Sequence, residues 1–289
     1  MRARDPDHEG FVERDGVRLY WEEFGAGDLT LVLLPCWSIV HSRIWKAQVP
    51  YLARYFRVVT FDGRGCGRSD RPDVAEAYHY SEFAADTVAV LDATGTPDAV
   101  LVGLSRGPLW GLKVAAESPE RVRGLVCLGA SIPLVPKHPE RAAQLFGERP
   151  DTTEGWAKYN HHYWLEGGYL DFVEFFAGRV YTEPHSTKHL EDFIEWALEV
   201  EPSTLVATNE GLGAANPDDF SELCSRVRAP VLVIHGDEDA ITPHATGPAL
   251  AEAAGGRLVT IAGGGHCVQA RHPVIVNHLI RRFVDRIAR

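Results

Sequence analysis

The sequence predicts an α/β fold in which helices flank a mostly parallel sheet. Over about the first 130 residues, short apolar runs typical of buried strands alternate with helix-like segments. The alternation stops near residue 132 and returns near residue 231. Strands that alternate with helices form parallel units joined by right-handed crossovers. We therefore expect both parts of the chain to contribute to one sheet.

The expected elements follow one another along the chain. Residues 17–22 alternate between polar and apolar side chains, as a half-buried strand does. Apolar runs predict buried strands at residues 29–34, 99–104, 125–128 and 231–235. Residues 57–61, which are rich in β-branched side chains, and residues 258–261 also have the pattern of strands. Helices are expected at residues 81–91, 108–117, 246–254 and 274–287. Ser81 is the expected N-cap of the first of these helices.

The segment between the two α/β parts has no clear buried strand and is rich in aromatic residues. At roughly 90 residues it is too long for a simple loop. We expect a core formed by residues 1–131 and 226–289, with residues 132–225 inserted as a helical cap, or lid. The cap aromatics can line a substrate chamber or form the cap's own core, because each helix buries one face. The substrate-facing candidates are Trp156, Tyr159, Tyr163 and Trp164.

Composition indicates an ordinary globular chain of 289 residues, 45% apolar and 24% charged. It has no apolar run long enough for a membrane span and no signal-peptide pattern at its start. A net charge of -11 disfavours nucleic acid and anionic lipid as partners. Five widely spaced cysteines without a CxxC pair indicate reduced thiols. We expect a cytoplasmic monomer or homodimer that binds a small-molecule substrate.

The stretch Gly103-Leu104-Ser105-Arg106-Gly107 has the GxSxG pattern. It follows a predicted buried strand and precedes a predicted helix, which is the context of a nucleophile elbow. There the serine hydroxyl is exposed next to a helix N-terminus, which favours developing negative charge. A chance match in a glycine-rich chain is the alternative. The flanking strand and helix favour a catalytic Ser105.

A serine hydroxyl needs a base, and the base needs an orienting acid. The candidate base is His266, in a glycine-rich loop between the last predicted strand and the last helix. Three acids, Asp237, Glu238 and Asp239, follow the strand at residues 231–235. Asp239 is the preferred partner, Asp237 is the main competitor and Glu238 is the least favoured.

These segments resemble the α/β-hydrolase superfamily, in particular its capped serine esterases and carbon–carbon bond hydrolases. The order Ser105, Asp239, His266 fits that of the superfamily. The stretch from Phe61 to Pro72 is similar to its D-x-R-G-x-G-x-S loop. The resemblance covers about residues 11–131 and 226–289. It implies an eight-stranded sheet and catalysis that needs neither a metal nor another cofactor.

One loop departs from the family pattern. The family has His-Gly-x after the third strand, where this chain has Pro35-Cys36-Trp37. The resemblance implies that the backbone N–H groups of Trp37 and Arg106 form the oxyanion hole. Cys36 has no base near it in the sequence and is interpreted as structural. The Arg106 side chain is either a substrate-anion contact or part of an ion pair at the helix start, and the ion pair is favoured.

The leading hypothesis is a serine hydrolase that cleaves an ester, thioester or lactone of a small, largely apolar substrate through an acyl-enzyme. Related dehalogenases and epoxide hydrolases carry aspartate where this chain has Ser105. The alternatives are carbon–carbon bond hydrolysis, acyl transfer, and ligand binding by a protein that retains the triad. Four cap histidines lack a recognised metal-ligand spacing: His161, His162, His185 and His189.

Overall fold

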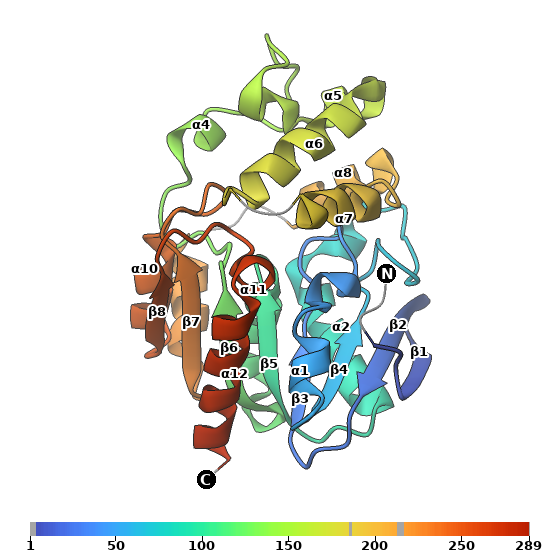
Figure 1. Cartoon of the computed structure of the whole chain (residues 1–289). Helices are drawn as coiled ribbons and strands as arrows, with labels where there is room; N and C mark the ends of the chain where they lie inside the picture. The colour runs from blue at the N-terminus through green and yellow to red at the C-terminus, as the bar shows by residue number, and fades with distance from the viewer. Residues whose placement is uncertain (1–3, 185–186, 213–216, 289) are drawn as a thin grey trace.

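The computed structural model describes residues 4–184, 187–212 and 217–288. Its centre is an eight-stranded sheet in the order β1-β2-β4-β3-β5-β6-β7-β8 (Figure 1). β2 pairs antiparallel with β1 and β4, and the remaining neighbours are parallel. The strands are β1 His8–Arg14, β2 Val17–Phe24, β3 Thr30–Leu33, β4 Arg57–Phe61, β5 Ala99–Leu104, β6 Val122–Leu128, β7 Val231–Gly236 and β8 Arg257–Ile261. The predicted fold class is confirmed.

Helices cover both faces of this sheet, which explains the continuous apolar runs of its strands. On β5, Val100 and Val102 belong to the cluster beneath α1 and α12, whereas Leu101 belongs to the cluster on the opposite face. The first face is covered by α1 (Val49–Leu52) and α12 (Pro273–Ile287). The other is covered by α2 (Tyr80–Ala93), α3 (Gly107–Glu117) and α10 (Thr246–Ala253).

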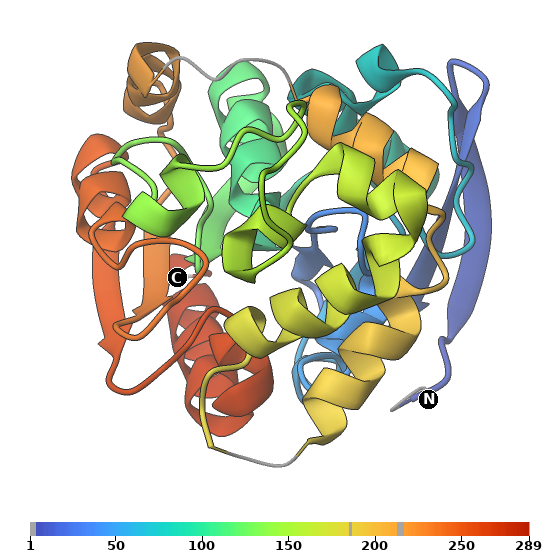
Figure 2. The ribbon, with the colours of Figure 1, turned by 90° about the horizontal axis from the view of Figure 1, so that it is seen from above.

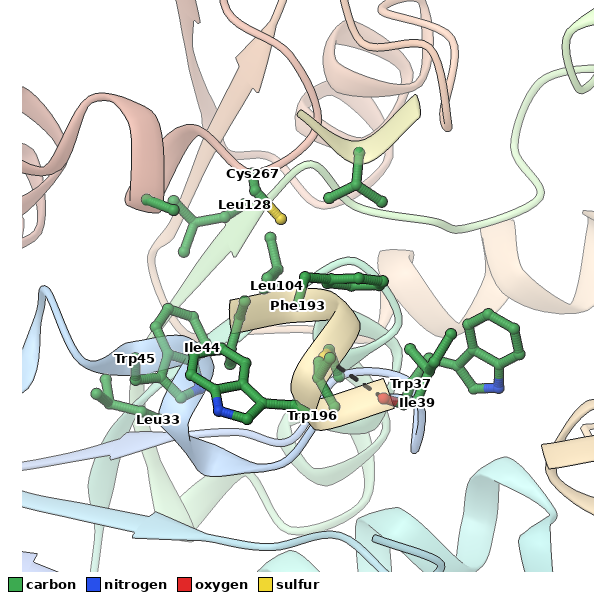
Figure 3. Packing of buried hydrophobic residues seen from close by; sticks show 14 of the residues in the cluster. Leu33, Trp37, Ile39, Ile44, Trp45, Leu104, Leu128, Phe193, Trp196 and Cys267 are labelled. Atoms are coloured by element: carbon green, nitrogen blue, oxygen red, sulfur yellow. Dashed lines mark hydrogen bonds between the residues drawn. The ribbon is translucent and has the colours of Figure 1, made fainter. Parts of the chain in front are cut away.

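Between β6 and β7 the described residues form helices, turns and loops. The helices are α4 Pro139–Ala142, α5 His161–Tyr163, α6 Tyr169–Val180, α7 Lys188–Ala197, α8 Pro202–Glu210 and α9 Pro217–Ser225. Helices α5 to α8 lie over one edge of the sheet (Figure 1), and α6 and α7 cross the middle of the molecule when seen from above (Figure 2). Phe193 and Trp196 of α7 share one apolar cluster with Leu104 at the end of β5 (Figure 3).

Two local features differ from the expectations. The edge strand β1 was not anticipated; it forms a hairpin with β2 through Asp15 and Gly16, both of which have positive φ. The N-cap of α2 is His79 instead of Ser81, because the helix starts one residue earlier and the His79 ring accepts the Ser81 N–H. No helix in the described ranges is both long and apolar enough to cross a membrane.

The loop that follows β4 is held by a buried ionic cluster. Arg64 donates two hydrogen bonds to Asp86 of α2, both of 2.7 Å, with side-chain exposures of 2% and 0%. Arg14 of β1 donates to the same carboxylate at 2.8 Å. Two arginines therefore compensate one fully buried carboxylate, and the cluster joins the edge strand to the loop after β4.

Replacing Asp86 with alanine removes the carboxylate closest to the buried Arg64 guanidinium, whose remaining ion-pair partner is Glu82 at 3.7 Å. The free energy of unfolding should fall by about 3–5 kcal/mol, because removing one partner of a buried ion pair leaves the other charge poorly compensated. Urea denaturation measures this loss. Asp98→Ala is the matched control, because Asp98 pairs with the more exposed Arg123 and should matter much less. Equal losses in the two variants would contradict the prediction.

Candidate active site

Ser105 occupies the turn between β5 and α3 and has a φ of 57°. This left-handed conformation is strained for a residue with a side chain. Two backbone hydrogen bonds hold it: the Ser105 N–H donates to the Leu128 carbonyl at 2.9 Å, and the Ser131 N–H donates to the Ser105 carbonyl at 2.7 Å. A Cβ at Gly103 would lie 2.5 Å from the backbone of Gly107. The turn therefore requires glycine at position 103.

His266 and Asp239 form a buried pair at the same edge. His266 Nδ1 lies 2.8 Å from Asp239 Oδ2. The other carboxylate oxygen accepts the N–H groups of Ile241 and Thr242 at 2.8 and 2.9 Å. With Nδ1 engaged by the carboxylate, His266 Nε2 is the ring nitrogen left for proton transfer.

The competing acids point elsewhere. Asp237 and Glu238 are both exposed. Asp237 accepts the Gly263 N–H at 2.7 Å, which tightens the loop that leads to His266. Of the three acids after β7, the structure brings Asp239 to the histidine.

Asp239 has a second histidine partner that the sequence analysis missed. His235 Nε2 lies 3.2 Å from Asp239 Oδ2, and neither side chain is exposed. Burial alone raises the pKa of the Asp239 carboxyl, but His266 and His235 outweigh burial and hold that pKa well below its usual range. Asp239 is therefore ionised and suited to stabilise an imidazolium at His266. The position of His235, four residues before an acid at a strand end, was the available signal.

Gly129 is a second missed residue. It directly follows β6 and has a φ of 48°. A Cβ at this position would lie 2.7 Å from the His266 carbonyl oxygen and 3.3 Å from His266 Nδ1. Any side chain here would push the histidine loop away, so Gly129 forms the floor of the site.

The Pro35-Cys36-Trp37 loop packs against the elbow helix. The Trp110 indole N–H of α3 donates to the Pro35 carbonyl at 2.9 Å. Within the described chain, the backbone N–H groups of Trp37 and Arg106 have no hydrogen-bond acceptor. Two donors are therefore free on the two segments that the sequence analysis assigned to the oxyanion hole.

Cys36 is buried, and its thiol lies 3.6 Å from the Trp37 carbonyl oxygen. Burial raises the pKa of this thiol to about 12, so it is protonated at neutral pH. The thiolate needed for nucleophilic attack is absent. All five cysteines are free and buried.

A cavity of about 460 Å³ lies beside the elbow. Ser105, Asp239 and His266 are not among its lining residues, but their neighbours are: Arg106 and Ser131 beside the serine, and Ile241 and Thr242 after the acid. It opens between the strand-end loops and the insertion. The site therefore has a small-molecule-sized chamber directly next to the candidate nucleophile.

The insertion contributes two of its four candidate aromatics to this cavity, Trp156 and Tyr159. Tyr163 and Trp164 do not line it. Trp164 is 1% exposed, and its indole N–H donates to the Lys158 carbonyl at 2.8 Å. Tyr163 donates its hydroxyl to Asp171 at 2.6 Å. Trp164 packs against Phe172 of α6 and against Trp37 outside the insertion, with ring centres 4.4 and 6.1 Å apart, whereas Tyr163 is only half-buried.

The ion pair favoured for Arg106 is not formed with any carboxylate in the described ranges. Its guanidinium instead donates to Asn209 Oδ1 at 2.9 Å and to the Tyr159 hydroxyl at 3.4 Å. It also lies over the Trp37 ring, 4.8 Å from the ring centre. Because all these partners are neutral, the charge of Arg106 is left uncompensated at the cavity wall.

Among the four histidines of the insertion, His161 and His162 lie side by side, with ring centres 4.1 Å apart. His161 lies 3.2 Å from Glu210, and His189 stacks on Tyr181; His185 lies outside the described residues. Across the described ranges, no group of three or more His, Cys, Asp or Glu side chains is arranged to hold a metal ion.

Glu183, between α6 and α7, is a third residue that the sequence analysis missed. Its carboxylate accepts the Gly265 N–H at 2.8 Å, one residue before His266. The Arg271 guanidinium, which follows the same loop, lies 3.7 Å from it. The insertion thus anchors the histidine loop directly. The sequence shows no signal for this contact, because it joins residues 82 positions apart.

A serine in a strained strand-to-helix turn, with a buried acid–histidine pair from later strand ends, defines an enzyme of the α/β-hydrolase type. The family model described as alpha/beta hydrolase fold matches residues 30–273, and the chain belongs to this family.

Three relatives illustrate the relationship. The chain is 27% identical over 263 residues to a pimeloyl-[acyl-carrier protein] methyl ester esterase of Sodalis glossinidius, covering 89% of this chain and 94% of the relative. It is 26% identical over 284 residues to a bifunctional esterase/perhydrolase of Acinetobacter calcoaceticus, covering 95% and 99%. A solved N-acyl homoserine lactone degrading enzyme superposes with a TM-score of 0.76 at 26% identity, covering 95% of this chain and 100% of that one.

Replacing Glu183 with alanine should lower kcat by about tenfold. The variant loses a hydrogen bond to a charged acceptor, worth about 1.5–3 kcal/mol, and frees the loop that carries His266. Steady-state kinetics on p-nitrophenyl butyrate measures the change. Glu183→Gln is the matched control, since its amide oxygen can still accept the Gly265 N–H and should retain more activity. Unchanged kcat in the alanine variant would show that the contact does not position the histidine.

Proposed function

We propose that this protein is a serine hydrolase that cleaves a carboxylic ester, thioester or lactone of a small, largely apolar substrate through an acyl-enzyme. The observation that carries the proposal is the left-handed Ser105 at the end of β5, at the edge that also holds the buried Asp239–His266 pair. The esterases and the lactone-degrading enzyme among its relatives support this reaction class.

In the first half-reaction the Ser105 hydroxyl attacks the substrate carbonyl carbon. His266 Nε2 removes the hydroxyl proton, and ionised Asp239 stabilises the resulting imidazolium. The negative charge that develops on the carbonyl oxygen is bound by the free N–H groups of Trp37 and Arg106. The imidazolium then returns its proton to the departing alcohol or thiol, which leaves an ester on Ser105.

In the second half-reaction water replaces the leaving group. His266 removes a proton from this water, which attacks the acyl-serine carbonyl. The same two N–H groups bind the second oxyanion, and collapse of the intermediate releases the acid and restores the Ser105 hydroxyl.

Residues 132–225 act in this proposal as a cap over a core formed by residues 1–131 and 226–289. Trp156 and Tyr159 contact the apolar part of the substrate, because their side chains line the cavity. A covered site excludes water and strengthens the oxyanion contacts. Tyr163 and Trp164 have no substrate contact in this proposal.

Ser105→Ala should abolish hydrolysis of p-nitrophenyl esters down to a small residual rate while the fold persists. The residual rate reflects oxyanion binding without the nucleophile. A fluorophosphonate should label the wild type and not the variant. Ser221→Ala, at an exposed position of α9, is the matched control and should keep both labelling and turnover. Full activity in Ser105→Ala would exclude this mechanism, and wild-type protein that binds esters without cleaving them would favour the ligand-binding alternative.

Asp239→Asn should lower kcat by up to about 10⁴, because an amide no longer stabilises the imidazolium or fixes the productive tautomer. Asp237→Asn should have a far smaller effect, since Asp237 is exposed and bonds only the loop backbone in the structure described. Both variants can be measured with the same p-nitrophenyl ester. The reverse ranking would assign the acid role to Asp237.

A further inference from the structure

The cavity beside the elbow is strongly cationic although the chain carries a net charge of -11. Three basic side chains line it: Arg106 at the start of α3, Arg141 on α4, and Lys137 on the loop after β6. No aspartate or glutamate is among its described lining residues. The positive charge is therefore concentrated at one wall of the candidate site.

The two arginines are held by neutral groups. Arg141 donates to the Ile241 carbonyl and lies over the Trp156 ring, 4.6 Å from its centre. Asp239 and Glu140 attract Arg141 through space, but neither forms an ion pair with it. Arg106 bonds the neutral side chains of Asn209 and Tyr159.

The three charges also repel one another. Desolvation in the cavity wall, and then repulsion by Arg141 and Arg106, lowers the pKa of Lys137. Desolvation likewise lowers the pKa of Arg106, and Arg141 adds to that shift. Clustered like charges are unfavourable at a partly desolvated cavity wall, and a bound anion would relieve both the repulsion and the lost hydration.

We propose that this cavity binds a carboxylate of the substrate, so that the hydrolysed ester or lactone carries a free acid group at the end of an apolar chain. This inference rests on the proposed serine-hydrolase function and specifies its substrate class. Guanidinium groups match the geometry of a carboxylate, and they hold it in a partly dehydrated site better than an ammonium would. The same cavity is also lined by the apolar side chains of Ile132, Phe146 and Trp156. These side chains suit a short hydrocarbon chain.

The kinetic test compares two matched substrates. One is the mono-p-nitrophenyl ester of a linear dicarboxylic acid of about six to eight carbons, and the other has its free carboxylate replaced by a carboxamide. A second pair carries the carboxylate or carboxamide on the alcohol side. The proposal expects at least one carboxylate ester to have a kcat/KM about 10- to 100-fold above its carboxamide, the range for a hydrogen bond to a charged group. Equal values within both pairs would overturn it.

Lys137→Glu tests the origin of that preference. Lys137 lies at the cavity rim and has no hydrogen-bond partner among the described residues, so the variant should fold. It should lower kcat/KM for the preferred carboxylate ester by about tenfold or more, and change that of its carboxamide by less than about threefold. Arg228→Glu changes the net charge equally at the opposite end of β7 and should leave both substrates unchanged. Equal effects of the two charge reversals would contradict the assignment.

A binding measurement tests the carboxylate site independently of the proposed hydrolase reaction. Calorimetry on Ser105→Ala should detect adipate binding that Lys137→Glu weakens in the same background, with inorganic phosphate binding less tightly. Adipate binding without hydrolysis of any ester would retain the anion site and reject the proposed reaction. Ester hydrolysis without adipate binding or carboxylate preference would retain the reaction and reject the anion site. Tighter binding of phosphate would overturn the carboxylate assignment.

Discussion

The left-handed turn at Ser105 is the constraint on which the rest of the site depends. Such a turn costs on the order of 1–3 kcal/mol, and it persists because its surroundings fix it. The end of β6 and the loop that follows it hydrogen-bond the backbone N–H and carbonyl of this residue, and Gly103 allows α3 to approach the strand. The sheet thus positions the serine before any substrate arrives. The neighbouring strand ends supply the other groups because parallel strands finish at one edge.

The residues tied to strand ends could be predicted from sequence. Ser105 and Asp239 each follow a strand that is buried throughout, a pattern that depends on burial of both faces of the sheet. His266 follows β8, whose residues are mostly exposed or half-buried, and its glycine-rich loop was the signal for it. The edge strand β1 was missed because its residues are largely exposed and lack a buried run. Its turn, Asp15-Gly16, carried the stronger signal: that pair is favoured in two-residue hairpins.

Contacts between distant segments could not be predicted from one sequence. Glu183 contacts Gly265 because the insertion comes back to the edge of the sheet. No local sequence pattern predicts a contact between such distant segments. The aromatic residues of the insertion show the same limit. Trp156 and Trp164 are both buried, yet Trp156 lines the cavity and Trp164 packs against Trp37 and Phe172. Hydrophobic periodicity identifies a buried face and not what lies opposite it.

Helices α7 and α4 of the insertion should differ in how well they tolerate substitutions, because α7 shares an apolar cluster with the sheet. Phe193 and Trp196 fill space against the ends of the strands, so a change of volume there disturbs the core itself. Helix α4 has no buried residue, although it carries Arg141 of the cavity wall. Evolution or protein engineering can therefore alter substrate selectivity through α4 at little risk to folding, whereas α7 must change together with the strands beneath it.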